Sequence, residues 1–170
     1  TLVNDTTKMS VILDVAGMEH KERYKTNLAN LYKSKGILFQ KAIGKDFNKL
    51  ADCSRLDEEG TAEFSIFKST LNSQELLSYI QMAQVINNYA RRQKLVSQKV
   101  NLSANEKFLM RTWLVRAGMV GEEYKFARKL LTESLPGNSA WLNKVNCMET
   151  QNYQVNNEEQ MMTDENDISM

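Results

Sequence analysis

SQELLSYIQMAQVINNYARRQKLVS, residues 73–97, is the stretch of sequence that decides the fold. Its apolar residues recur at three- and four-residue spacing, which is typical of one face of an amphipathic helix. Ser73 is a residue type that caps helix starts, and the cations near residue 92 suit the negative end of a helix dipole. The stretch therefore predicts one long helix. Its expected buried residues are Leu76, Leu77, Ile80, Ala83, Ile86 and Ala90.

Two shorter helices joined by a glycine turn are predicted after the long helix. Ser103 and Glu106 match a capping box, in which each side chain satisfies a free backbone donor, so the first helix is expected from there to about residue 117. Gly118 and Gly121 bracket the turn, and Pro136 ends the second helix. The residues expected to face inward are Leu109, Trp113, Leu114, Tyr124, Ala127, Leu130, Leu131 and Leu135.

The residues ahead of the long helix predict a smaller β component and another helix. Residues 10–17, SVILDVAG, and residues 62–68, AEFSIFK, are typical of short strands, and residues 57–60 are typical of a turn. A helical pattern runs from residue 19 as far as residue 50, and Gly36 and Gly44 are potential breaks. One bent helix and two helices both fit this pattern. We therefore predict a predominantly helical α+β fold, with two short strands, a long helix and a C-terminal helix-turn-helix-like pair.

The charge is distributed unevenly along the chain, although the net charge is only +1. Residues 71–144 hold eleven basic and five acidic residues, whereas residues 145–170 hold six acidic residues and no basic one. We expect residues 9–144 to form a single globular domain and residues 145–170 to be an acidic, disordered tail. Residues 1–8 precede Met9, a plausible initiator, and are treated as upstream-encoded residues or residues added for expression.

The composition indicates a cytoplasmic protein. No apolar run approaches the roughly 20 residues that span a bilayer, and the first 18 residues lack the layout of a secretory signal. Cys53 and Cys147 are far apart in the sequence and are expected to be free thiols.

The sequence contains no recognisable catalytic, cofactor-binding or metal-binding constellation. His20 is the single histidine, so no metal site can use two histidines, and no glycine-rich phosphate loop occurs. We therefore expect a protein that is not an enzyme and has no cofactor. The opposing hypothesis, an unrecognised enzyme, requires a pocket lined by polar groups around His20.

Basic residues gather in the second half of the chain. In the last predicted helix, Lys125, Arg128, Lys129 and Thr132 are spaced to lie along one exposed stripe. A basic stripe on the second helix of a helix-turn-helix can contact nucleic acid through phosphates. A solvated basic face is the other interpretation. The candidate binding residues are Arg91, Arg92, Lys94, Arg111, Arg116, Lys125, Arg128 and Lys129.

Residues 105–141, NEKFLMRTWLVRAGMVGEEYKFARKLLTESLPGNSAW, resemble a known family. The resemblance is carried by Arg-x-Trp-Leu at residues 111–114, the two glycines of the turn, Glu-Tyr-Lys at residues 123–125 and the Gly-Asn-Ser-Ala close. The family is labelled "virulence-related protein" and is encoded on phages and integrative elements of Firmicutes. The resemblance implies an accessory protein of a mobile genetic element and no particular biochemical activity. Ala117 and Trp141-Leu142 depart from the family pattern.

Two functions fit these observations. The first is a non-enzymatic accessory protein of a mobile element that binds nucleic acid or a nucleoprotein complex through the basic helical pair. The alternative is a protein-binding inhibitor or adaptor, such as a blocker of a host defence (CRISPR-type) nuclease. Deleting residues 145–170 should abolish partner inhibition under the alternative, and should spare or strengthen DNA binding under the first function.

Overall fold

The computed structural model describes residues 9–15, 18–46, 54–58, 60–101, 105–138 and 140. The expected N-terminal extension, residues 1–8, and the expected acidic tail, residues 145–170, lie outside the described residues. The described elements confirm a predominantly helical α+β fold. In chain order they are β1 (Val11–Asp14), α1 (Lys21–Ile43), β2 (Ser54–Leu56), β3 (Thr61–Phe64), α2 (Ser73–Arg92), α3 (Glu106–Ala117), the 3-10 helix η2 (Glu122–Tyr124) and α4 (Lys125–Glu133).

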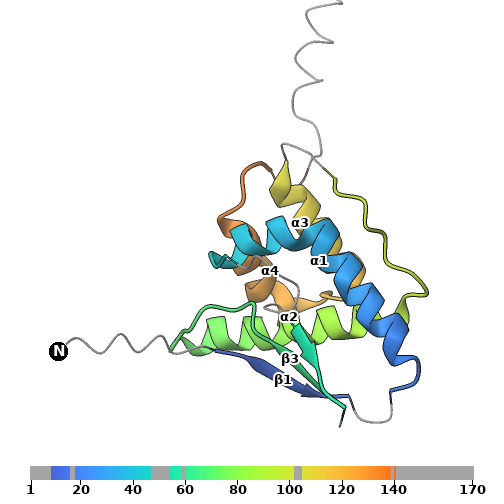
Figure 1. Cartoon of the computed structure of the whole chain (residues 1–170). Coiled ribbons are helices and arrows are strands. Elements are labelled where there is room, and N and C mark those ends of the chain that lie inside the picture. The colour runs from blue at the N-terminus through green and yellow to red at the C-terminus, as the bar shows by residue number, and fades with distance from the viewer. Residues whose placement is uncertain are drawn as a thin grey trace, which may run out of the picture.

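Helix α2 lies between the small sheet and the other three helices (Figure 1). It contacts β1 on one side, and α1, α3 and α4 pack against its other surfaces. One hydrophobic core fills these contacts. The predicted long helix is therefore the central element of the fold.

The sheet has three antiparallel strands in the order β1-β3-β2, one more than predicted. The predicted turn joins β2 to β3, and Asp57 Oδ1 accepts the backbone N–H groups of Gly60 and Thr61 at 2.8 and 2.6 Å. Strand β3 ends at Phe64, earlier than predicted. Ile66 and Phe67 lie beyond the end of the strand and are both fully buried.

Helix α1 is a single helix that passes through Gly36 and ends before Gly44. Gly44 adopts a left-handed conformation with φ of 69°, and its N–H donates to Gln40 O at 2.8 Å. A glycine readily takes this conformation, so Gly44 ends the helix well before residue 50. Gly36 is buried within the helix.

Helix α2 differs from the prediction at both ends. Its N-cap is Asn72 and not Ser73, since Asn72 Oδ1 accepts the N–H groups of Gln74 and Glu75 at 2.9 and 3.2 Å. It ends at Arg92 and not near residue 97. Asn27 of α1 binds the backbone just beyond, accepting the Val96 N–H at 2.9 Å, so that segment satisfies its polar groups without continuing the helix.

The buried face of α2 also differs from the predicted stripe. Leu76 and Leu77 are exposed, by 39% and 54%, whereas Ala83, Ile86 and Ala90 are buried as predicted. A helix advances by about 100° per residue, which puts Leu77 roughly 160° from the centre of the buried face. The core is completed by residues that the predicted stripe omitted, namely Ser78, Tyr79, Met82, Val85 and Asn87.

Helices α3 and α4 form the predicted helix-turn-helix-like pair. The N-cap of α3 is Asn105, whose Oδ1 accepts the Phe108 N–H at 3.1 Å. Helix α3 therefore begins later than a capping box at Ser103 would place it. Ser103 itself lies outside the described residues. Gly118 and Gly121 form the turn with positive φ angles of 121° and 103°. Trp113 and Leu114 are buried as predicted, while Leu109 is only partly buried.

Candidate nucleic-acid interface

The eight predicted binding residues come from three elements. Arg91, Arg92 and Lys94 lie at the C-terminal end of α2 and just beyond it. Arg111 and Arg116 belong to α3, and the remaining three belong to α4. Two of the eight, Arg92 and Arg128, bind backbone carbonyl groups of the described structure.

Arg92 fastens the end of α2 to the end of α3. Its Nη2 donates to Ala117 O at 2.8 Å, which is one of the carbonyl groups that a helix end leaves without an internal partner. The same Nη2 lies 3.4 Å from the place where a Cβ on Gly118 would stand. Arg92 therefore has a structural role at this junction.

Arg128 holds the turn between α3 and α4. Its Nη1 donates to Met119 O and to Gly121 O, both at 2.9 Å. The side chain is half-buried, so it is not part of a freely exposed stripe. Thr132 is buried as well, and its hydroxyl donates to Arg128 O at 2.7 Å. The expectation of one exposed stripe on α4 is therefore wrong for Arg128 and Thr132.

Lys125 and Lys129 are the predicted α4 residues that are exposed. Lys125 pairs with Glu122 at 3.1 Å, and both side chains are largely solvated. An exposed pair of this kind contributes little to stability. Gln81, near the middle of α2, donates to Glu123 O at 3.2 Å, which places the start of α4 away from the C-terminal end of α2. Of the eight residues, Arg92 and Arg128 are thus engaged with backbone carbonyl groups, and Lys125 is engaged with Glu122.

The ends of α2 and α3 bring a different set of cations together. Because Arg92 contacts Ala117, the residue next to Arg116, the end of α2 that carries Arg91 and Lys94 adjoins the end of α3 that carries Arg116. We call Arg91, Lys94 and Arg116, together with Lys35 of α1, the junction cluster. Burial and the charge of Arg116 lower the pKa of Lys35, which shows that these two cations lie close together.

The junction cluster is short of acidic partners. Ion pairs join Lys25 to Glu22, Lys41 to Glu106 and Lys125 to Glu122, and no ion pair among the described residues involves a member of the cluster. The negative ends of the α2 and α3 dipoles offset part of this positive charge.

Arg111 extends the cationic surface along α3. It lines a shallow depression of about 470 Å³ with Arg116, and the other lining residues are Phe108, Thr112 and Val115. The depression is open and largely apolar apart from its two guanidinium groups. Arg111 and Arg116 are therefore the predicted α3 residues that lie on a common face.

A second cavity lies at the start of α1, around His20. It has a volume of about 430 Å³ and is lined by Met18, Glu19, His20, Arg23, Tyr24 and Arg91. This is the polar pocket that the enzyme hypothesis required. His20 and Glu19 are the groups there that could act as a base, and the described lining holds no serine or cysteine nucleophile.

Sequence reasoning missed Arg23, because 68 positions separate it from Arg91 and no local pattern links them. Near these arginines, a buried hydrogen bond of 2.9 Å from the Tyr24 hydroxyl to Asn87 Oδ1 connects α1 to α2. Burial raises the pKa of Tyr24, and the nearby charge of Arg91 partly offsets that rise. The one signal of this contact in the sequence was a polar residue on the inward face of each helix, Tyr24 in α1 and Asn87 in α2.

The described residues were also compared with the requirements of metal and membrane sites. They contain no group of three or more His, Cys, Asp or Glu side chains that could hold a metal ion. No helix in the same part of the chain has both the length and the apolar character needed to cross a bilayer. The resemblance of residues 105–141 to the virulence-related family remains a prediction, because no family model, curated protein or solved structure matches this chain.

Proposed function

We propose that this protein binds nucleic acid, alone or in a nucleoprotein complex, as a non-enzymatic accessory protein of a mobile genetic element. The single observation that supports this function is the junction cluster, whose cations are carried by the adjoining ends of α2 and α3 and by α1 and have no acidic partner among the described residues. Polynucleotide phosphates are the abundant intracellular anions that such a cluster would bind. The family resemblance supports the accessory role.

The chemistry of binding would be mainly electrostatic. A protein that neutralises phosphates releases condensed counterions, so its affinity falls steeply as the salt concentration rises. The lowered pKa of Lys35 reflects burial together with repulsion from Arg116. A phosphate between these two cations would relieve the repulsion. We therefore expect phosphate binding to be more favourable at this cluster than at an isolated lysine.

The test compares two double variants that remove the same charge from different surfaces. Lys94→Gln/Arg116→Gln neutralises two members of the junction cluster, and Lys125→Gln/Lys129→Gln neutralises the exposed α4 lysines. Fluorescence anisotropy with labelled single- and double-stranded DNA and RNA, over a range of salt concentrations, gives the affinity and its salt slope. We expect the junction variant to lower the magnitude of the log–log slope by about two, and the α4 variant to change it little.

Two results would contradict the proposal. A larger loss in the α4 variant would move the binding surface to α4, as the sequence alone suggested. No saturable binding of the unaltered protein to any of the four nucleic acids would reject nucleic-acid binding itself.

A protein-binding inhibitor or adaptor is the second candidate, and exposed leucines favour it. Leu71 is fully exposed and Leu77 is 54% exposed at the start of α2, where the sequence predicted core residues at positions 76 and 77. Exposed apolar side chains that lie close together are typical of protein-binding surfaces. Deleting residues 145–170, with their six acidic residues, should abolish inhibition of a host nuclease under this function and spare nucleic-acid binding under the first.

A further inference from the structure

The cavity at the start of α1 has the size of a small-ligand site. Its volume of about 430 Å³ falls within the range of about 300–1,000 Å³ that ligand pockets occupy. Three segments build it: residues 18–20, the first turn of α1 and the C-terminal end of α2. Met18 supplies an apolar wall, and the other five lining residues are polar, charged or aromatic.

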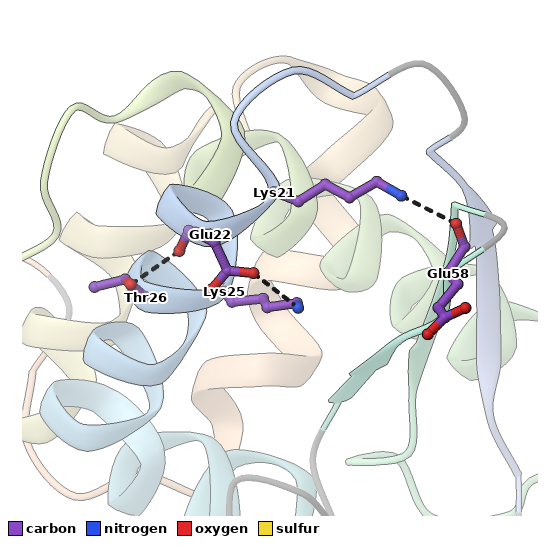
Figure 2. A network of polar contacts seen from close by, with 5 residues as sticks. All are labelled: Lys21, Glu22, Lys25, Thr26 and Glu58. Carbon is purple, nitrogen blue, oxygen red and sulfur yellow. Dashed lines mark hydrogen bonds and ion pairs between the residues drawn. The ribbon is translucent and has the colours of Figure 1, made fainter.

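Two guanidinium groups from different helices line this cavity. Neither Arg23 nor Arg91 forms a hydrogen bond or ion pair with a described residue. Neighbouring cations in the first turns of α1 are engaged elsewhere (Figure 2): Lys21 donates to Glu58 O at 3.0 Å and Lys25 pairs with Glu22 at 3.0 Å. Arg23 is thus the cation of this segment that is left for the cavity.

The backbone that carries both arginines is held firmly. Tyr24 is 2% exposed, and its hydroxyl donates to Asn87 Oδ1 at 2.9 Å, one turn of α2 before Arg91. One turn further along α1, Asn27 donates to the carbonyl oxygens of Ala90 and Gln93 at 3.0 and 2.8 Å. These bonds fix the spacing of α1 and α2 on both sides of Arg91 and directly after Arg23, so a ligand would not have to order that spacing itself.

The remaining polar groups of the cavity suggest which anion it would bind. Guanidinium groups form paired hydrogen bonds with phosphate oxygens. A phosphate monoester carries a second negative charge that a diester lacks, and two guanidinium groups match these two charges. His20 adds two ring nitrogens. The Glu19 carboxylate repels phosphate but accepts hydrogen bonds from hydroxyl groups, which a nucleotide carries on its sugar.

We infer that this cavity binds the terminal phosphate monoester of a nucleotide, with Arg23 and Arg91 on the phosphate. Arg91 belongs both to this cavity and to the junction cluster, so a strand whose end enters the cavity would continue onto Lys94 and Arg116. The ligand is therefore the phosphorylated end of a polynucleotide. The choice of a strand end over a free nucleotide rests on the proposed function. The phosphate site itself rests only on the cavity and its two arginines.

The test uses oligonucleotides of one sequence that carry a 5′-phosphate, a 3′-phosphate or neither, with fluorescence anisotropy at near-physiological salt. We expect one of the phosphorylated ends to bind at least about tenfold more tightly than the unphosphorylated strand, as one or two charge-assisted bonds would give. Arg23→Gln should abolish that preference, so that the phosphorylated and unphosphorylated strands bind alike. Lys25→Gln, on the same helix but engaged with Glu22, should retain the preference.

The possible outcomes separate this inference from the proposed function. Equal binding of all three strands, or a preference that survives Arg23→Gln, would overturn the cavity assignment, while salt-sensitive binding would still support the proposed function. If no strand binds, the proposed function fails, and adenosine 5′-monophosphate then tests the cavity by itself. Shifts of the Arg23 and Arg91 side-chain Nε–H resonances on titration would support the phosphate site, and unchanged resonances would overturn it.

Discussion

Asn27 is a single polar side chain that joins three segments of the chain. It is fully buried in α1, and its amide makes three hydrogen bonds, to Ala90 O, Gln93 O and Val96 N–H. A buried polar group is costly unless it is hydrogen-bonded, and here both the donor and the acceptor of the amide are used. Asn27 therefore determines where α2 ends and where the following segment lies.

Replacing Asn27 by alanine should destabilise the protein by about 3 kcal/mol or more, because two carbonyl oxygens and one N–H lose their buried partner. Asn30→Ala is the matched control. Its amide donates to Val96 O alone, so its loss should be about 1 kcal/mol. Urea unfolding followed by circular dichroism measures both. Equal losses would show that the three bonds of Asn27 contribute no more than the one of Asn30.

Tyr24 should make the stability fall at high pH. Burial raises the pKa of its hydroxyl above the value of about 10 in an unfolded chain, and Arg91 partly offsets this. The stabilisation is fully present below pH 10 and is lost as the pH rises toward the folded-state pKa, since only the unfolded chain releases the proton. Tyr24→Phe should lose stability less steeply between pH 9 and 11 in urea unfolding. Parallel pH profiles of the two proteins would contradict this. Burial and the charge of Glu75 also raise the pKa of Tyr79, but Tyr79 is present in both proteins and does not affect the comparison.

At the scale of elements, the turn between α3 and α4 depends on one arginine. Arg128→Gln should destabilise the protein by about 1–3 kcal/mol, because the carbonyl groups of Met119 and Gly121 lose a charged donor. Lys129→Gln removes the same charge from the next residue, which is exposed, and should change stability by less than about 0.5 kcal/mol. Thermal unfolding of the two variants provides the comparison. A larger loss for Lys129→Gln would reject this role for Arg128.

Helix α2 offers a second comparison between exposed and buried positions. Leu77→Gln should leave stability within about 0.5 kcal/mol of the unaltered protein, since Leu77 is 54% exposed. Ile86→Ala, at a fully buried position of the same helix, should cost about 2–5 kcal/mol through lost packing and a cavity. Chemical unfolding distinguishes the two. A loss above about 2 kcal/mol for Leu77→Gln would instead support the stripe that the sequence predicted.

These elements also show what the sequence could predict. The helices and the glycine turn followed from periodicity and from residues with strong local preferences. Strand β2 did not, because three residues, Ser-Arg-Leu, carry too little pattern and the strand forms only by pairing with β3. Ser73 was predicted as the cap of α2, but asparagine is an equally good capping residue type, and the geometry selects Asn72.

From the sequence, the candidate site could be predicted only as a set of basic residues, without their arrangement in space. The sequence identified Arg91, Lys94 and Arg116, but no local pattern could show that Arg92 binds a carbonyl group at the end of α3 and that Arg128 binds two in the turn before α4. Arg23 was missed for the same reason, because the cavity it lines exists only when α1 and α2 pack together.

At the scale of the whole molecule, one core should give one unfolding transition. Trp113 of α3 contacts Phe39 of α1 and Tyr89 of α2, with ring centroids 5.0 and 5.9 Å apart, so its fluorescence reports on three helices. In a Trp141→Phe background, fluorescence and far-ultraviolet circular dichroism should therefore give the same midpoint. Fluorescence that changes at lower denaturant would indicate that α3 separates from the core before the helices unfold.

The long-range bonds of α1 also determine when the chain can fold during its synthesis. Asn27 must wait for Val96, 69 residues later, and the Lys41 carbonyl must wait for Ser134, 93 residues later. At about 5–20 residues per second, a ribosome needs several seconds to synthesise those partners. Throughout that interval the apolar face of α1 has no α2 to pack against. Helix α1 can therefore complete its packing only after the middle third of the chain has left the ribosome.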